Sequence, residues 1–219
     1  SIAVDSSDRT HIAYFYNTYS NLRYAKENGS SWDTQDVDTG SYSNSISFEL
    51  DSMDRPRIAY GSSNDARLAY SNNGGESWTI LDVDTENNVG SYMSMALGSQ
   101  GEALLTYQDD TNNDLRHSVA YTGVSWNQQE LIGTGELGSS VVGTGIFISD
   151  RAVLIPYLNN QSGSKQIKVM TKHQEGLESS SIEGDDSSTG LYTSNVIDSV
   201  GVEHIAYYNS TSTSLMYAK

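Results

Sequence analysis

The sequence predicts an all-β fold, specifically a five-bladed β-propeller built of four-stranded antiparallel blades. Three observations support this prediction. A short apolar run ending in tyrosine recurs five times, most repeats carry four runs of alternating polarity, and no segment shows a sustained helical period of 3.6 residues. The recurring tyrosines are spaced by 46, 47, 50 and 50 residues, at Tyr14, Tyr60, Tyr107, Tyr157 and Tyr207.

The repeats divide the chain into segments that we expect to form a single domain over residues 1–219. Their bounds are 1–46, 47–93, 94–143, 144–193 and 194–219. The first run of each repeat opens on Ser or Thr, and these runs are predicted to be the innermost strands, at residues 1–5, 47–51, 94–98, 144–148 and 194–198. The tyrosine run follows as the second strand. Clusters of Gly, Asn, Asp and Ser separate the runs, as expected for turns between antiparallel strands.

The last repeat contains only three strand-like runs. We therefore expect a fifth blade that lacks its outer strand, with residues 214–218 as an exposed edge able to pair with another chain or with further repeats. We also expect the ring to close by side-chain packing between the first and fifth blades. No disulfide can assist, because the chain has no cysteine.

Composition limits the choice of partner and compartment. The net charge is −16, from 28 acidic and 12 basic residues, so a nucleic acid is disfavoured as a ligand. No apolar run is long enough for a transmembrane helix, which predicts no membrane insertion. Three Asn-x-Ser/Thr triplets hint at an extracellular or cell-surface protein.

The stretch from Ser71 to Trp78 carries a motif. Its Ser71, Asn73, Gly75 and Trp78 resemble the Asp-box, Ser-x-Asp-x-Gly-x-x-Trp, of the sialidase-like propellers, with Asn73 in place of the aspartate. The resemblance implies a structural hairpin turn between the third and fourth strands of a blade. It implies nothing about catalysis, since the box lies far from the active site in that family.

A hydrolase of the sialidase type remains an alternative. That activity needs an arginine cluster to hold a carboxylate, a tyrosine nucleophile activated by a glutamate, and an aspartic acid. None of the seven arginines stands in the Arg-Ile-Pro signature of the family, and the catalytic propeller of the family has six blades. We therefore predict no catalytic residue. Convergence of three arginines at one end of the channel would favour the enzyme instead.

Neither a metal nor a cofactor is expected. Asp109, Asp110 and Asp114 offer the hard oxygen ligands that Ca²⁺ prefers, but they lack the spacing of a calcium loop with a closing glutamate. They fit a solvated turn better. His11 and His204 occupy the same position in the first and last repeats, so we interpret both as structural.

Three tryptophans follow a Gly-x-x turn signal and allow two interpretations. Trp32, Trp78 and Trp126 either pack between blades, which we predict, or stack on sugar rings. The repeat text also resembles the fungal fucose-binding lectins, propellers whose sugar sites lie between adjacent blades. On that interpretation Arg23 and Arg116 join the tryptophans as candidate ligand contacts.

These observations favour a non-enzymatic extracellular binding or scaffold module that recognises a carbohydrate or a protein. A ring of equivalent loops presents several similar contacts more readily than one asymmetric catalytic centre. The alternatives are the sialidase-type glycoside hydrolase and a structural segment of a larger surface protein.

Overall fold

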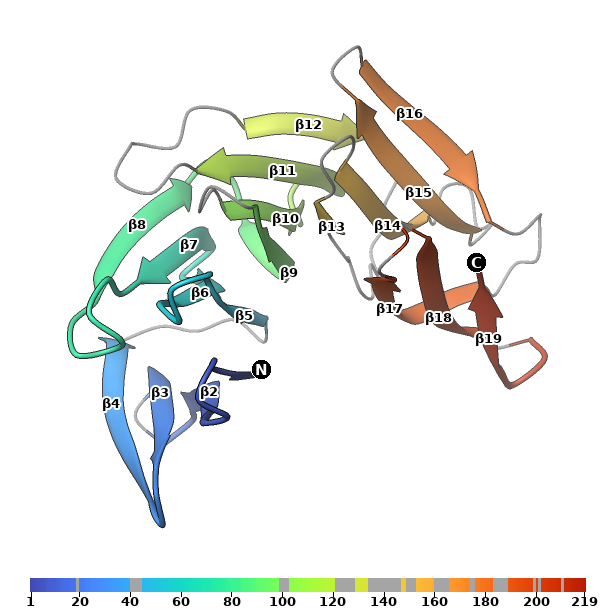
Figure 1. Ribbon diagram of the computed structural model, residues 1–219. Helices are drawn as coiled ribbons and strands as arrows, with labels where there is room; N and C mark the ends of the chain where they lie inside the picture. The colour runs from blue at the N-terminus through green and yellow to red at the C-terminus, as the bar shows by residue number, and fades with distance from the viewer. Residues whose placement is uncertain are drawn as a thin grey trace.

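A computed structural model describes residues 1–18, 20–39, 45–98, 103–120, 129–133, 147–148, 153–159, 166–173, 176–182, 189–198, 200, 202–209 and 211–219. Within these residues the chain forms nineteen strands and no helix. The strands make five separate antiparallel sheets, each following the last along the chain (Figure 1). The prediction of an all-β fold made of antiparallel sheets is confirmed.

Strand order within every sheet follows the sequence. The first sheet holds β1 (Ile2–Val4), β2 (Thr10–Tyr16), β3 (Asn21–Asn28) and β4 (Ser31–Thr39). The second holds β5 (Ile46–Leu50), β6 (Pro56–Ser62), β7 (Asp65–Tyr70) and β8 (Thr79–Asp84). The third holds β9 (Val89–Leu97), β10 (Ala103–Asp109), β11 (Asp114–Ala120) and β12 (Gln129–Gly133). The fourth holds β13 (Phe147–Ile148), β14 (Val153–Asn159), β15 (Gln166–His173) and β16 (Gly176–Ser181). The fifth holds β17 (Thr189–Ile197), β18 (Glu203–Asn209) and β19 (Ser214–Ala218).

The sheets stand side by side along an arc (Figure 1). Their first strands β1, β5, β9, β13 and β17 lie toward the inside of the arc, while β4, β8, β12 and β16 lie on its outside. The innermost strands predicted at residues 1–5, 47–51, 94–98 and 194–198 are thus confirmed. Of the run predicted at 144–148, only residues 147–148 lie within the described part of the chain, in β13. Burial is greatest in the second strands, because β6 and β10 are buried along their whole length, whereas the outer strand β4 is largely exposed.

The core lies between neighbouring sheets rather than inside any one of them. One cluster joins the first and second sheets and includes Ala13, Leu22, Tyr24, Phe48 and Tyr60. A second cluster joins the second and third sheets, and a third joins the fourth and fifth. Strand alternation sends successive side chains to opposite faces, so each sheet supplies one face to each neighbour.

A ladder of side chains also ties the second sheet to the third. The backbone N–H groups of Met93, Met95 and Leu97 in β9 donate to the side chains of Ser45, Ser47 and Glu49, at 3.0 Å for Ser47 and 3.1 Å for Glu49. The ladder satisfies the donors along an inner edge strand that has no backbone partner on that side. The serine that opens the second repeat therefore has a structural role.

The fifth sheet has three strands, as predicted. Among the described residues β19 pairs only with β18, and Leu215 and Tyr217 on β19 are 80% and 61% exposed. The expected exposed edge at residues 214–218 is therefore present. No helix suited to crossing a membrane occurs in the part of the chain that the structure describes.

The expectation that the first and fifth blades pack together is wrong. The sheets form an open arc, and its two ends face each other across an opening (Figure 1). Ile2 and Val4 on the first sheet and Leu215 and Tyr217 on the fifth stay exposed, so neither end sheet covers the other. Among the described residues the fifth sheet also has no fourth strand to contact the first, as β4 and β8 contact the sheets that follow them.

Candidate functional site

An aspartate that ends the first strand of a repeat organises the turn that follows it. Asp5 accepts hydrogen bonds from the backbone N–H groups of Ser7 and Arg9, both at 2.9 Å, through one oxygen. Its other oxygen accepts from the side chains of Arg9 and His11 at 2.8 Å and 3.1 Å. Burial of Asp5 raises the pKa of its carboxyl, but these bonds outweigh burial and leave the pKa below its usual value.

The same turn recurs twice. Asp51 accepts from Arg55 and Arg57, and Asp198 accepts from the backbone of Val200 and Val202 and from His204. Each aspartate thus accepts a hydrogen bond from the side chain of the residue six positions later. The structural interpretation of His11 and His204 is consistent with these bonds.

Each histidine also reaches a tyrosine on the third strand of its sheet. Because Asp5 accepts from Nε2 of His11, the proton lies on that nitrogen, and Nδ1 accepts from the Tyr24 hydroxyl at 2.5 Å. His204 makes the corresponding contacts with Asp198 and Tyr217. We call Asp5, His11 and Tyr24 the first triad, and Asp198, His204 and Tyr217 the last triad.

A second recurring group connects neighbouring sheets. Asp38, at the outer strand of the first sheet, accepts from the Tyr60 hydroxyl at 2.7 Å and pairs with Arg67 at 3.4 Å. One sheet further along, Asp84 accepts from the Tyr107 hydroxyl at 3.0 Å and pairs with Arg116 at 2.8 Å. Burial, and then the hydrogen bond to Asp38, raises the pKa of Tyr60.

The described arginines are engaged in ion pairs with aspartates of the same chain. All six arginines in the described part of the chain contact an aspartate, and Arg151 lies outside it. The candidate Arg116 is 12% exposed and bridges Asp84 and Asp109. The candidate Arg23 is 25% exposed, pairs with Asp36 at 2.8 Å and lies over the Tyr16 ring. Arg55 and Arg57 share one carboxylate, but it is that of Asp51, so the described arginines are occupied by carboxylates of the chain itself.

The Asp-box stretch forms a tight turn held by its own side chains. The Ser71 hydroxyl accepts from the Gly75 N–H at 2.9 Å and donates to Asn73 Oδ1 at 2.8 Å, and Asn73 Oδ1 also accepts from the Ser77 N–H at 3.0 Å. An asparagine thus performs the acceptor role in this turn. Gly75 has a φ of +98°, and a Cβ there would lie 2.5 Å from the Tyr24 ring, so only glycine fits.

The turn packs against the first sheet. Trp78 meets Tyr24 edge to face, with ring centroids 5.1 Å apart, and joins the cluster between the first two sheets. Trp32, at the same place in the first repeat, is 47% exposed, so the prediction that it is mostly buried is wrong. No described sheet lies against this face of the first sheet. Trp126 lies outside the described residues.

The acidic turn after β10 is bound by its own neighbours. Asp109 is fully buried and accepts from Arg116 at 2.5 Å, from the Asn87 and Asn112 side chains, and from two backbone N–H groups. Asp110 accepts from the Ser91 hydroxyl at 2.6 Å. Asp114 lies opposite Asp109 in the backbone register of strands β10 and β11. In the described part of the chain no three Asp, Glu, His or Cys side chains are grouped to hold a metal ion.

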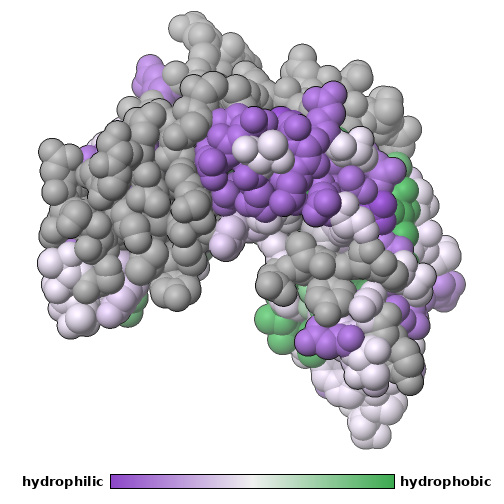
Figure 2. Space-filling model, turned by 180° about the vertical axis from the view of Figure 1, so that it is seen from behind, coloured by the Kyte–Doolittle hydropathy of each residue, from purple (hydrophilic) through white to green (hydrophobic). Residues whose placement is uncertain are grey.

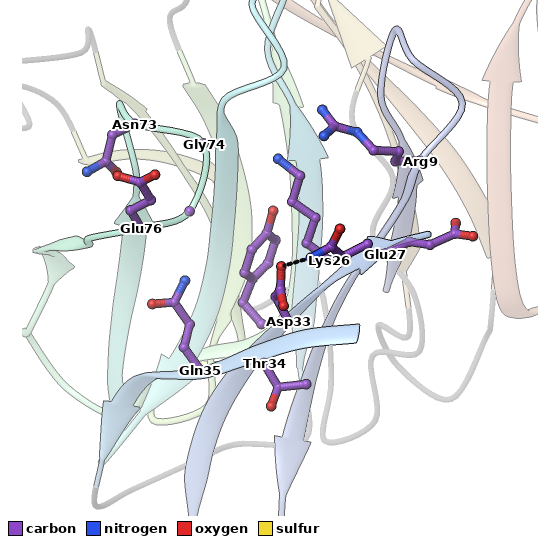
Figure 3. Close-up of a pocket in the computed structure, with 12 residues that line it drawn as sticks. Arg9, Lys26, Glu27, Asp33, Thr34, Gln35, Asn73, Gly74 and Glu76 are labelled. Atoms are coloured by element: carbon purple, nitrogen blue, oxygen red, sulfur yellow. Dashed lines mark hydrogen bonds between the residues drawn. The ribbon is translucent and has the colours of Figure 1, made fainter. Parts of the chain in front are cut away.

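A cleft of about 540 Å³ opens between the first sheet and the Asp-box turn of the second. Figure 3 shows Lys26, Asp33 and Gln35 on the first sheet, across from Asn73 and Glu76 on the turn. Asp33 accepts from the Asn28 side chain at 3.0 Å. The side chains of Lys26, Gln35 and Glu76 have no hydrogen-bond or ion-pair partner among the described residues, so they are available to a ligand.

Sequence reasoning missed three of these features. An aspartate six residues before the histidine or arginine of three repeats was a visible signal for the Asp turns. The recurring Asp-Val-Asp-Thr text at residues 36–39 and 82–85 was a signal for the anchors between sheets. The cleft had no signal, because its two walls come from different repeats.

Comparison with known proteins identifies the fold but no family. No family model and no curated protein matches the chain. Among solved structures, a mutant of the NanB sialidase from Streptococcus pneumoniae matches 90% of this chain and 34% of its own, with a TM-score of 0.62 and 15% identity. A leech intramolecular trans-sialidase matches 91% and 36%, with a TM-score of 0.58 and 14% identity.

An ulvan lyase of polysaccharide lyase family PL25 matches 99% of this chain and 63% of its own, with a TM-score of 0.69 and 11% identity. The chain spans about a third of the length of the two sialidases named above. These neighbours share a sialidase-like fold of antiparallel sheets with this chain. At such low identity the likeness concerns the fold alone.

Proposed function

We propose that the chain is a non-enzymatic recognition module, acting outside the cell or at its surface, that binds a carbohydrate in the cleft between the first and second sheets. The observation that carries the proposal is the contrast between engaged and available groups. The described arginines are held by aspartates, while Lys26, Gln35 and Glu76 line the cleft and their side chains have no hydrogen-bond or ion-pair partner among the described residues.

The chemistry of the cleft suits a polyhydroxylated ligand. Amide, carboxylate and ammonium groups can donate to or accept from sugar hydroxyls. The position between adjacent sheets agrees with what the resemblance to the fucose-binding lectins implies. The structural neighbours named above act on glycans, which supports a carbohydrate over a protein as the first ligand to test.

A glycan-array screen followed by titration calorimetry tests this proposal. We expect Lys26→Ala and Gln35→Ala each to weaken binding of the best glycan about 10-fold, the usual cost of one lost hydrogen bond to a charged or amide group. Glu86→Ala is the control, since it removes an exposed charged side chain outside the cleft. Equal losses in all three variants, or no glycan bound at millimolar concentration, would contradict the proposal.

The glycoside-hydrolase alternative is favoured by the sialidases among the structural neighbours. It is tested on the same samples with fluorogenic sialosides. Binding without turnover supports a recognition module. Turnover that survives in Lys26→Ala would place an active site elsewhere and would refute the non-enzymatic function.

A further inference from the structure

Exposed apolar side chains gather at the two ends of the arc. Among the described residues, six of the eleven large hydrophobic side chains that remain exposed lie on the outward faces of the first and fifth sheets. We call the outward face of the first sheet the head face, with Ile2, Val4 and Trp32 exposed by 64%, 60% and 47%. The outward face of the fifth sheet is the tail face, with Val196, Leu215 and Tyr217 exposed by 63%, 80% and 61%.

The repeat shows what such faces do when they are covered. In the contact between the first and second sheets, Leu22 and Tyr24 are 1% and 2% exposed, and Phe48 is 4% exposed. Leu22 and Tyr24 correspond in the repeat to Leu215 and Tyr217 of the tail face. Phe48 and Trp78 correspond to Ile2 and Trp32 of the head face. The two ends of the arc thus carry the two halves of a contact that the molecule already makes.

The matching extends to polar groups. The tail sequence Leu-Met-Tyr-Ala-Lys repeats Leu-Arg-Tyr-Ala-Lys of β3, so Lys219 stands where Lys26 stands. In the existing contact the Lys26 ammonium lies against the turn of the next sheet, 3.9 Å from where a Cβ of Gly74 would be. The corresponding turn on the head face carries Glu27, whose position in the repeat is that of Asn73. A lysine on the tail face thus has a carboxylate at the matching position of the head face.

We propose that the head face of one copy of this chain binds the tail face of a second copy, with Tyr217 against Trp32 in the geometry of Tyr24 against Trp78. The contact continues the stacking of sheets past the end of the arc. It joins two different surfaces, so association is head to tail. Within one copy the two faces stand apart across the opening (Figure 1), and Figure 2 shows hydrophobic surface on the first sheet beside that opening.

Sedimentation velocity across a concentration series tests the proposal on the whole chain. The wild-type chain should associate as concentration rises, and Trp32→Ala or Tyr217→Ala should each weaken association at least about 10-fold, as removal of a central aromatic does at an interface. Met53→Ala removes another exposed hydrophobic side chain, 67% exposed, that lies on neither face, and should associate like the wild type.

Mixing the two variants gives the sharpest result. Trp32→Ala retains an intact tail face and Tyr217→Ala retains an intact head face, so a mixture can form one intact contact and should yield a discrete 1:1 dimer. Neither variant alone should do so. Circular dichroism and melting curves show whether each variant is folded.

Three outcomes would overturn the proposal. The first is a wild-type chain that stays monomeric with Trp32 accessible to a fluorescence quencher. The second is a monomer with Trp32 protected, which would mean that the arc closes on itself. The third is association that the variants do not weaken, or a mixture of variants that forms no heterodimer.

Discussion

The first and last triads make the same bonds in very different surroundings. In both, an aspartate accepts from the histidine at 3.1 Å and the histidine contacts a tyrosine hydroxyl. Tyr24 is nevertheless 2% exposed, whereas Tyr217 is 61% exposed. The bonds are local to one sheet and are fixed by the repeat sequence. Burial of the tyrosine depends on a neighbouring sheet. The second sheet covers the first triad with Trp78, whereas no described sheet covers the last triad.

Truncation of the two tyrosines should distinguish the contribution of the hydrogen bonds from that of burial, with the largest expected effect on stability. We expect Tyr24→Ala to lower the free energy of unfolding by about 3 to 5 kcal/mol, because it empties a buried aromatic site between two sheets. Tyr217→Ala loses a similar hydrogen bond but little buried surface, so about 1 kcal/mol is expected. Urea denaturation measures both. Similar losses would mean that the hydrogen bond, and not the packing, dominates.

Two arginines allow a similar comparison between buried and exposed ion pairs. Arg116→Met should cost about 3 kcal/mol or more, because it leaves Asp84 and Asp109 without their cation while both carboxylates are fully buried. Arg23→Met should cost at most about 1 kcal/mol, since its partner Asp36 is 45% exposed and is screened by water. Thermal unfolding of the two variants decides. Equal effects would show that Arg23 has a buried anionic partner after all.

The sequence predicted the repeat but could not predict its ends. Turn signals, alternation and the recurring tyrosine are properties of one blade, so the sheets, their order and their inner strands followed from the text. Trp32 and Trp78 have the same signal and differ in exposure because the first sheet covers Trp78, whereas no described sheet covers Trp32. The cleft depends on side chains from two repeats. Such features arise from how repeats meet, and a single repeat does not encode them.

Two glycines at the same place in the repeat refine the comparison further. Gly75→Ala should destabilise the fold by about 2 kcal/mol or more, since a Cβ at this position meets the Tyr24 ring and the φ of +98° disfavours any other residue. Gly29→Ala meets no atom within 4 Å and suffers only from its φ of +64°, so about 1 kcal/mol is expected. Melting temperatures measure the difference. A larger loss at Gly29 would contradict the idea that cover by the next sheet sets the cost.

A glutamate on an inner strand gives the smallest expected change in the free energy of unfolding, and this change depends on pH. Glu49 in β5 accepts the Leu97 N–H of the next sheet at 3.1 Å, while its counterpart in β1 is Ala3, which has no carboxylate. Burial raises the pKa of Glu49 to about 7, from 4.5 in an unfolded chain, against the opposing effect of that hydrogen bond.

The folded protein therefore keeps a proton on Glu49 that the unfolded chain releases between about pH 4.5 and 7. The stability that this group contributes is complete below pH 4.5 and is lost as the pH rises through 7. Glu49→Gln keeps an oxygen that accepts from Leu97 and has no charge to bury. We expect it to stabilise the chain by about 1 to 2 kcal/mol at pH 8, with no gain at pH 4. Glu86→Gln, an exposed glutamate, should do neither. A gain for Glu49→Gln that is equal at pH 4 and pH 8 would show that packing, and not ionisation, limits this contact between sheets.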